Sequence, residues 1–141
     1  MIEIPLFNDS EVERVLCVVA HPDDMEYGGS AAVAKWTDEG KEVAYLLLTR
    51  GEAGIRDMQP DEVASLRADE QRRACNIVGV DDLEILDFPD GLVEPTHELR
   101  RAIARKIREY LELVCGDPDL RTSVLDVGEG VAISVKKGSD A

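Results

Sequence analysis

A short apolar run that ends in a cluster of polar residues constrains the fold of this chain more than any other feature. Residues 15–20 have strand length and are rich in β-branched side chains, so they predict a buried strand. One histidine, three carboxylates and two adjacent glycines follow: His21, Asp23, Asp24, Glu26, Gly28 and Gly29. Charged side chains are costly beside a core unless they pair or bind something. The stretch therefore predicts a strand, a loop suited to holding a ligand, and the start of a helix.

The rest of the chain alternates strand-like and helix-like patterns. Predicted strands cover residues 15–20, 43–49 and 83–86, and predicted helices cover residues 29–39, 61–78 and from 96 towards 110. The strand at 43–49 is apolar almost throughout, which is typical of a strand buried on both faces of a parallel sheet. The predicted fold class is therefore α/β, a parallel sheet with right-handed crossovers and helices on both faces. Ligands of such sheets bind at the carboxyl ends of the strands.

The sequence beyond residue 110 gives weaker signals. Residues 111–115 fit either a continuation of the last helix or a short fourth strand. Two short apolar patches follow at 123–127 and 131–135. The final six residues are polar and are predicted to form a loose tail.

Length and charge limit the classes of function. With 141 residues the chain has the size of one domain. Its 30 acidic and 16 basic residues give a formal net charge of −14, which argues against binding to nucleic acid or to an anionic membrane surface. No apolar run approaches the ~20 residues of a membrane span, and no signal-type segment is present, so we expect a cytoplasmic protein. The three cysteines are isolated, which argues against a disulfide framework and a cysteine-based zinc site.

The residues after the first strand have the chemistry of a metal site. An imidazole nitrogen and a carboxylate oxygen are common zinc ligands, and His21 and Asp24 supply one of each. Asp23 could stay off the metal as the general base for a bound water, and Glu26 could orient a ligand. The alternative is a half-buried histidine followed by turn-forming aspartates, because short motifs often arise by chance.

Further motifs occur in a consistent order along the chain. They are Ala20-His21-Pro22-Asp23-Asp24, Thr49-Arg50-Gly51-Glu52-Ala53-Gly54, Leu66-Arg67 with Glu70 and Ala74, and Phe88-Pro89-Asp90-Gly91. Over about residues 13–118 the set resembles the PIG-L/LmbE-like zinc-dependent N-deacetylases. The resemblance implies a Rossmann-like fold and the removal of an acetyl group from an N-acetylglucosamine-type sugar or related amide.

The resemblance also implies roles for individual residues. His21 and Asp24 would bind Zn²⁺ and Asp23 would be the general base, while Arg67 and Asp90 fall at positions that the family places near the substrate. From the residues alone, Arg67 could instead form an i,i+3 ion pair with Glu70. Asp90 could equally serve only in a turn.

The chain departs from the family pattern after about residue 118. The family takes its third zinc ligand from a later histidine, but this chain has only His21 and His97, and His97 matches no family motif. We therefore expect a deacetylase domain at 1–118 and a divergent tail at 119–141 with no assigned domain. We expect the chain to be a C-terminally truncated family member with an incomplete sheet and impaired catalysis. An open sheet edge would also favour a homo-oligomer.

Three hypotheses follow. The first is a zinc-dependent deacetylase of a small N-acetylated sugar. The second is a non-catalytic remnant of that fold, acting as a binding module or representing a truncated gene product. The third, a nucleotide-binding domain, is disfavoured because the first strand is not followed by Gly-x-Gly-x-x-Gly and because acidic residues there would repel a pyrophosphate.

Overall fold

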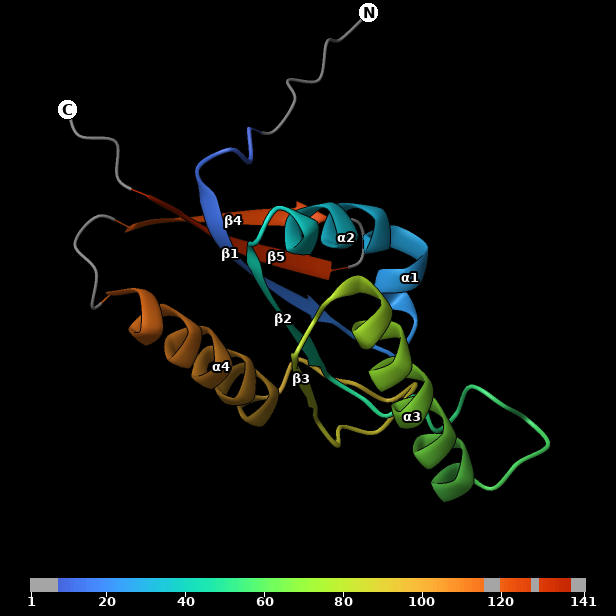
Figure 1. Ribbon diagram of the computed structural model, residues 1–141. Helices are drawn as coiled ribbons and strands as arrows, with labels where there is room; N and C mark the ends of the chain where they lie inside the picture. Colours follow the sequence, from blue (N-terminus) through green and yellow to red (C-terminus); the bar gives the residue numbers. More distant parts are fainter. Residues whose placement is uncertain (1–7, 116–119, 128–129, 138–141) are drawn as a thin grey trace, which may run out of the picture.

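The structure is a computed structural model that describes residues 8–115, 120–127 and 130–137, with side chains described through residue 110. Its elements follow in the order β1 (Val12–Val19), α1 (Asp24–Gly28), α2 (Ser30–Asp38), β2 (Glu42–Leu47), α3 (Pro60–Val78), β3 (Asp82–Ile85), α4 (His97–Cys115), β4 (Leu120–Val127) and β5 (Gly130–Lys137). Figure 1 shows their arrangement.

The strands form one sheet with the order β3-β2-β1-β5-β4. β1, β2 and β3 are parallel, with Val15 opposite Val43 and Tyr45 opposite Leu83, which confirms the predicted parallel sheet. β5 runs antiparallel to β1, and β4 pairs with β5. The two apolar patches of the tail thus belong to strands that extend the sheet beyond the edge of β1. Pairing with β5 gives the backbone groups of β1 hydrogen-bond partners on both sides.

Helices cover both faces of the parallel strands, as predicted (Figure 1). Successive β1 residues face opposite sides, because side chains alternate along a strand. Val15 and Cys17 pack in one core cluster with Val33 of α2 and Cys75 of α3. The other cluster contains Leu16, Val18, Ala44, Leu46 and Tyr110, with Ile103 and Ile107 of α4 packed against it. Among the described residues, no helix has both the length and the apolar character that a membrane crossing requires.

Several element boundaries differ from the predicted ones. The helix expected at 29–39 corresponds to α2, and the short helix α1 precedes it, so Asp24 and Glu26 lie in a helical turn and not in a loop. Pro60 occupies the start of α3, where its missing N–H costs nothing, and Gln59 takes the N-cap position predicted for Asp61. α4 continues to Cys115, which decides between helix and strand for 111–115.

Hydrogen bonds beyond the strand ends keep the three strand exits side by side. The Thr49 N–H donates to Ala20 O at 2.9 Å, and the Phe88 N–H donates to Leu48 O at 3.2 Å. The fully buried Thr49 hydroxyl adds a bond to Ala20 O at 3.0 Å and accepts the Gly51 N–H at 3.2 Å. The polar residues after each strand therefore meet at one edge of the sheet.

Candidate functional site

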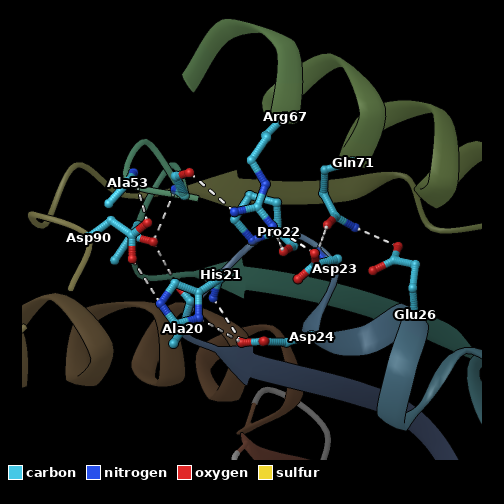
Figure 2. A network of polar contacts seen from close by, with 12 residues as sticks. Ala20, His21, Pro22, Asp23, Asp24, Glu26, Ala53, Arg67, Gln71 and Asp90 are labelled. Carbon is cyan, nitrogen blue, oxygen red and sulfur yellow. Dashed lines mark hydrogen bonds and ion pairs between the residues drawn. The ribbon is translucent and has the colours of Figure 1, made fainter. Parts of the chain in front are cut away.

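A hollow of about 330 Å³ lies where the exits of β1, β2 and β3 meet. Its lining residues are His21, Asp23, Ala53, Gly54, Arg67 and Asp90. Four residues that the sequence singled out thus line one hollow, and Asp24 lies against His21 (Figure 2). Glu26 lies away from the hollow, at the right of Figure 2, where its carboxylate accepts a hydrogen bond from Gln71 of α3.

His21 has a carboxylate at each side of its ring. Its Nδ1 lies 3.5 Å from Asp24 Oδ2, and its Nε2 lies 3.0 Å from Asp90 Oδ1. The His21 backbone N–H also donates to Asp24 Oδ2 at 2.9 Å, which fixes the Asp24 side chain beside the imidazole. The ring is 38% exposed and faces the hollow. Nδ1 and Asp24 Oδ2 are therefore two potential metal ligands, while Asp90 orients the ring from the other side.

Asp23 has a strained backbone. Its φ of +83° lies in the left-handed region, which non-glycine residues seldom occupy. The Asp23 N–H donates to Gln71 Oε1 at 3.0 Å, and Asp23 Oδ2 accepts a bond from Arg67 Nη2 at 2.7 Å. Residues in such conformations persist when their surroundings hold them there. Two α3 side chains hold the backbone and the carboxylate of Asp23.

Arg67 joins two strand exits. Besides Asp23, its guanidinium donates to Pro22 O at 2.7 Å and to Gly51 O at 3.1 Å. Gly51 has a φ of +67°, and a Cβ at this position would collide with the guanidinium. Arg67 is directed at the strand exits, and among its described contacts the ion pair is with Asp23 and not with Glu70.

Asp90 ties the β3 exit to the loop after β2. Its Oδ2 accepts the Ala53 N–H at 3.0 Å, and its own N–H donates to Glu52 Oε1 at 2.8 Å. Only 8% of the Asp90 side chain is exposed. Gly91, with a φ of +75°, completes a turn, so Asp90 is both a turn residue and a contact of His21.

Gln71 is the site residue that sequence reasoning missed. It is only 3% exposed, and its Nε2 donates to Glu26 Oε1 at 3.0 Å. Gln71 lies one helical turn after Arg67 and one turn before the buried Cys75. A long polar side chain within the buried stripe of a predicted helix was the signal that could have found it.

The described residues contain no group of three His, Cys, Asp or Glu side chains placed to hold a metal ion. His97 is exposed at the start of α4 and does not line the hollow. Cys17 and Cys75 are buried free thiols, and burial raises the pKa of Cys17 to about 12, so this group stays protonated. The side chain of Cys115 lies outside the described residues. Neither His97 nor the buried thiols therefore adds a potential ligand beside His21 and Asp24 in the described part of the chain.

Comparisons with known proteins identify a family and several related proteins. Residues 16–122 match the sequence model of the PIG-L family, GlcNAc-PI de-N-acetylase. The chain is 41% identical over 105 residues to a diacetylchitobiose deacetylase from Thermococcus kodakarensis, covering 73% of this chain and 39% of that protein. It is 38% identical over 84 residues to a 1D-myo-inositol 2-acetamido-2-deoxy-alpha-D-glucopyranoside deacetylase from Kineococcus radiotolerans, covering 55% of this chain and 23% of that protein.

A solved structure is similar as well. The N,N'-diacetylchitobiose deacetylase from Pyrococcus horikoshii aligns with a TM-score of 0.69 and 27% identity, covering 72% of this chain and 39% of that one. The chain thus spans about two fifths of the length of the Thermococcus and Pyrococcus proteins.

Proposed function

Because the chain belongs to the PIG-L family, GlcNAc-PI de-N-acetylase, we propose that its site removes the acetyl group from a small N-acetylglucosamine-type sugar with the help of Zn²⁺. The observation that carries this proposal is that His21, Asp23 and Asp90 line one hollow, with Asp24 against His21. We also propose that residues 1–118 form the deacetylase domain, because the family match covers most of that range.

The ligand pair fits two positions of a zinc site. Two donors that each lie about 2.0–2.1 Å from a tetrahedral zinc ion are themselves about 3.3 Å apart. His21 Nδ1 and Asp24 Oδ2 are 3.5 Å apart, close to that separation. When bound, zinc lowers the pKa of a water molecule to about 7 and polarises a carbonyl oxygen. We assign His21 and Asp24 as ligands, with Asp90 fixing the ring so that Nδ1 is the ligating atom.

Asp23 is assigned as the general base. Arg67 holds its Oδ2, while 51% of the Asp23 side chain stays exposed. The free carboxylate oxygen can therefore accept a proton from a water in the hollow as that water attacks the amide carbon. The same proton then passes to the leaving nitrogen as the C–N bond breaks, which releases acetate and the free amine.

Arg67 and Asp90 are assigned to the wall that faces the sugar, because both line the hollow. A guanidinium has five N–H donors, and three are used here on Pro22 O, Gly51 O and Asp23 Oδ2. An Asp90 carboxylate that already accepts the Ala53 N–H has lone pairs left for a sugar hydroxyl. Both residues can thus contact substrate while keeping their contacts to the protein.

The test is acetate release from N,N'-diacetylchitobiose and from N-acetylglucosamine with added Zn²⁺. Asp23→Asn should lower the rate by about 10²–10⁴-fold, the usual contribution of a general base. Asp69→Asn is the matched control, because Asp69 is an exposed α3 residue whose side chain pairs with Arg72. Absence of release, or release that survives Asp23→Asn, would refute the proposed activity.

A second candidate is a non-catalytic binding module with the same fold. It is favoured by the absence, among the described residues, of a third ligand for the metal pair. This candidate predicts sugar binding without acetate release and without stoichiometric zinc binding. Tight zinc binding by the purified chain, abolished by His21→Ala, would argue against it.

A further inference from the structure

We propose that Gln71 is a positioning residue for Asp23, and that Glu26 is the residue that fixes the orientation of the Gln71 amide. The Gln71 side chain bridges the Asp23 N–H and the Glu26 carboxylate, with both hydrogen bonds at 3.0 Å (Figure 2). The catalytic part of this inference rests on the role of Asp23 under the proposed function. The structural part, that Gln71 holds the backbone at Asp23, is testable separately.

The chemistry of the bridge requires an amide. A backbone N–H can only donate, and an ionised carboxylate can only accept. The residue between them must therefore offer one acceptor and one donor, which Gln71 does through Oε1 and Nε2. A glutamate at this position would place two acceptors against the Glu26 carboxylate, and a leucine would remove both hydrogen bonds of the bridge.

Burial explains why the bridge matters. Gln71 is 3% exposed, so water does not readily replace either of its hydrogen bonds. A buried polar group that loses its partner costs more than the bond itself contributes. The Glu26 carboxylate must therefore face Nε2, and this leaves Oε1 pointing at the Asp23 N–H.

The left-handed backbone at Asp23 is what the bridge holds. With a φ of +83°, the Asp23 N–H turns towards α3 and its carboxylate reaches Arg67 Nη2 at 2.7 Å. Arg67 and Gln71 are four residues apart on α3, so they present their side chains on one helical face. Arg67 holds the carboxylate of Asp23, and Gln71 holds its backbone. Loss of the bridge would let Asp23 relax to an ordinary φ and turn its carboxylate away from the hollow.

The test is a reciprocal exchange of the two bridging residues in the ¹⁵N-labelled 141-residue chain. Gln71→Glu and Gln71→Leu should each speed hydrogen exchange of the Asp23 N–H by about tenfold or more, since a protecting bond is lost. The double variant Gln71→Glu/Glu26→Gln restores one donor and one acceptor, and it should return the exchange rate to within about twofold of the starting chain. Glu70→Gln, at an exposed neighbouring position, is the control and should change nothing.

Deacetylation supplies the second readout. Gln71→Glu should lower kcat with KM little changed, because Asp23 is misplaced while the hollow is intact, and the double variant should recover kcat. An unchanged Asp23 exchange rate in the single variants would overturn the proposal. A double variant whose Asp23 N–H exchanges as fast as in Gln71→Glu would also overturn it. So would a double variant that is unfolded to the same extent as Gln71→Glu. If exchange responds as expected but no variant releases acetate, the hold on Asp23 stands and the proposed function fails. If exchange responds while kcat does not, the positioning role in catalysis is refuted.

Discussion

Two sides of the same site are held in different ways. On the Asp23 side, the contacts come from α3, through Arg67 and Gln71. On the His21 side, they come from Asp90 in the loop after β3 and from Asp24 in the first turn of α1. Figure 2 shows both sets of contacts around the hollow.

The difference has a physical consequence. α3 is a 19-residue helix with buried residues that include Val63 and Cys75, and Cys75 packs in one core cluster with residues of β1 and β2. Side chains on such a helix have little conformational freedom, so they can hold a strained residue such as Asp23 in a fixed orientation. The His21 side depends on loop residues that are bonded to one another, such as Asp90 to the Ala53 N–H. Damage to the Asp23 side should therefore lower the stability of the fold, while damage to the His21 side should mainly lower metal affinity.

The largest expected effect is that of Arg67→Leu. This change removes three hydrogen bonds from a guanidinium that is only 15% exposed, and it leaves Pro22 O and Gly51 O without that partner. We expect the free energy of unfolding, measured with urea, to fall by about 2–4 kcal/mol. Arg72→Leu is the control, because Arg72 is 62% exposed and pairs with the exposed Asp69, so it should cost less than about 0.5 kcal/mol. Equal losses in the two variants would contradict a special role for Arg67.

Gly51→Ala tests the same side from the loop after β2. The alanine would have to adopt a φ of +67°, and its methyl group would collide with the Arg67 guanidinium. We expect a loss of about 1–3 kcal/mol in the free energy of unfolding, measured as above. Gly28→Ala is the control, since nothing lies within 4 Å of a Cβ there and its φ is not positive. A Gly51 variant as stable as the Gly28 variant would show that Arg67 can move without cost.

The sequence was sufficient to predict the parts of the site that depend on local pattern. The apolar run at 15–20 followed by His21 is recognisable as a strand exit, and alternating strands and helices imply that such exits meet at one sheet edge. The α/β class, the parallel strands and the helices on both faces followed from the same pattern and are confirmed.

Contacts that depend on the relative placement of distant elements could not be predicted. Whether Arg67 pairs with Glu70 or with Asp23 depends on how α3 lies across the β1 exit, and side-chain spacing within the helix is compatible with both. The pairing of β5 with β1 joins residues more than a hundred positions apart. Gln71 was missed for a related reason, because its partners Asp23 and Glu26 lie 48 and 45 positions away.

Asp90→Asn tests the His21 side. The variant keeps an acceptor for the Ala53 N–H but loses the charged contact to His21 Nε2 at 3.0 Å. Second partners of ligating histidines tune metal affinity, so zinc affinity measured by calorimetry should fall by about tenfold. The free energy of unfolding should fall by less than about 1 kcal/mol. Asp87→Asn is the control, because Asp87 is 80% exposed and pairs with Arg50. An Asp90 variant that loses stability as Arg67→Leu does would remove the distinction between the two sides.

The smallest expected effect is that of a change at Asp9, which contacts α2 outside the site. It provides a reference against which the effects on the two sides of the site can be compared. Hydrogen bonds from Lys35 and Trp36 lower the pKa of the Asp9 carboxyl from 3.8 to about 2. The unfolded chain therefore takes up this proton at a higher pH than the folded one. The stability that Asp9 contributes is complete above pH 4 and is lost as the pH falls towards 2.

Asp9→Asn should thus cost less than about 1 kcal/mol at pH 6, because the ion pair is near the surface, and the cost should shrink towards zero by pH 2. Urea unfolding of the starting chain and the variant across this range measures the difference. The hydrogen bonds of the Asp9 carboxylate are to Lys35 and Trp36, away from Arg67 and Asp90. The same difference in the free energy of unfolding should therefore appear in the Arg67→Leu and Asp90→Asn backgrounds. If the pH-dependent effect of Asp9→Asn changes in one of these backgrounds, then the background substitution, Arg67→Leu or Asp90→Asn, also disturbs α2. The effect of that background substitution could then not be assigned to one side of the site.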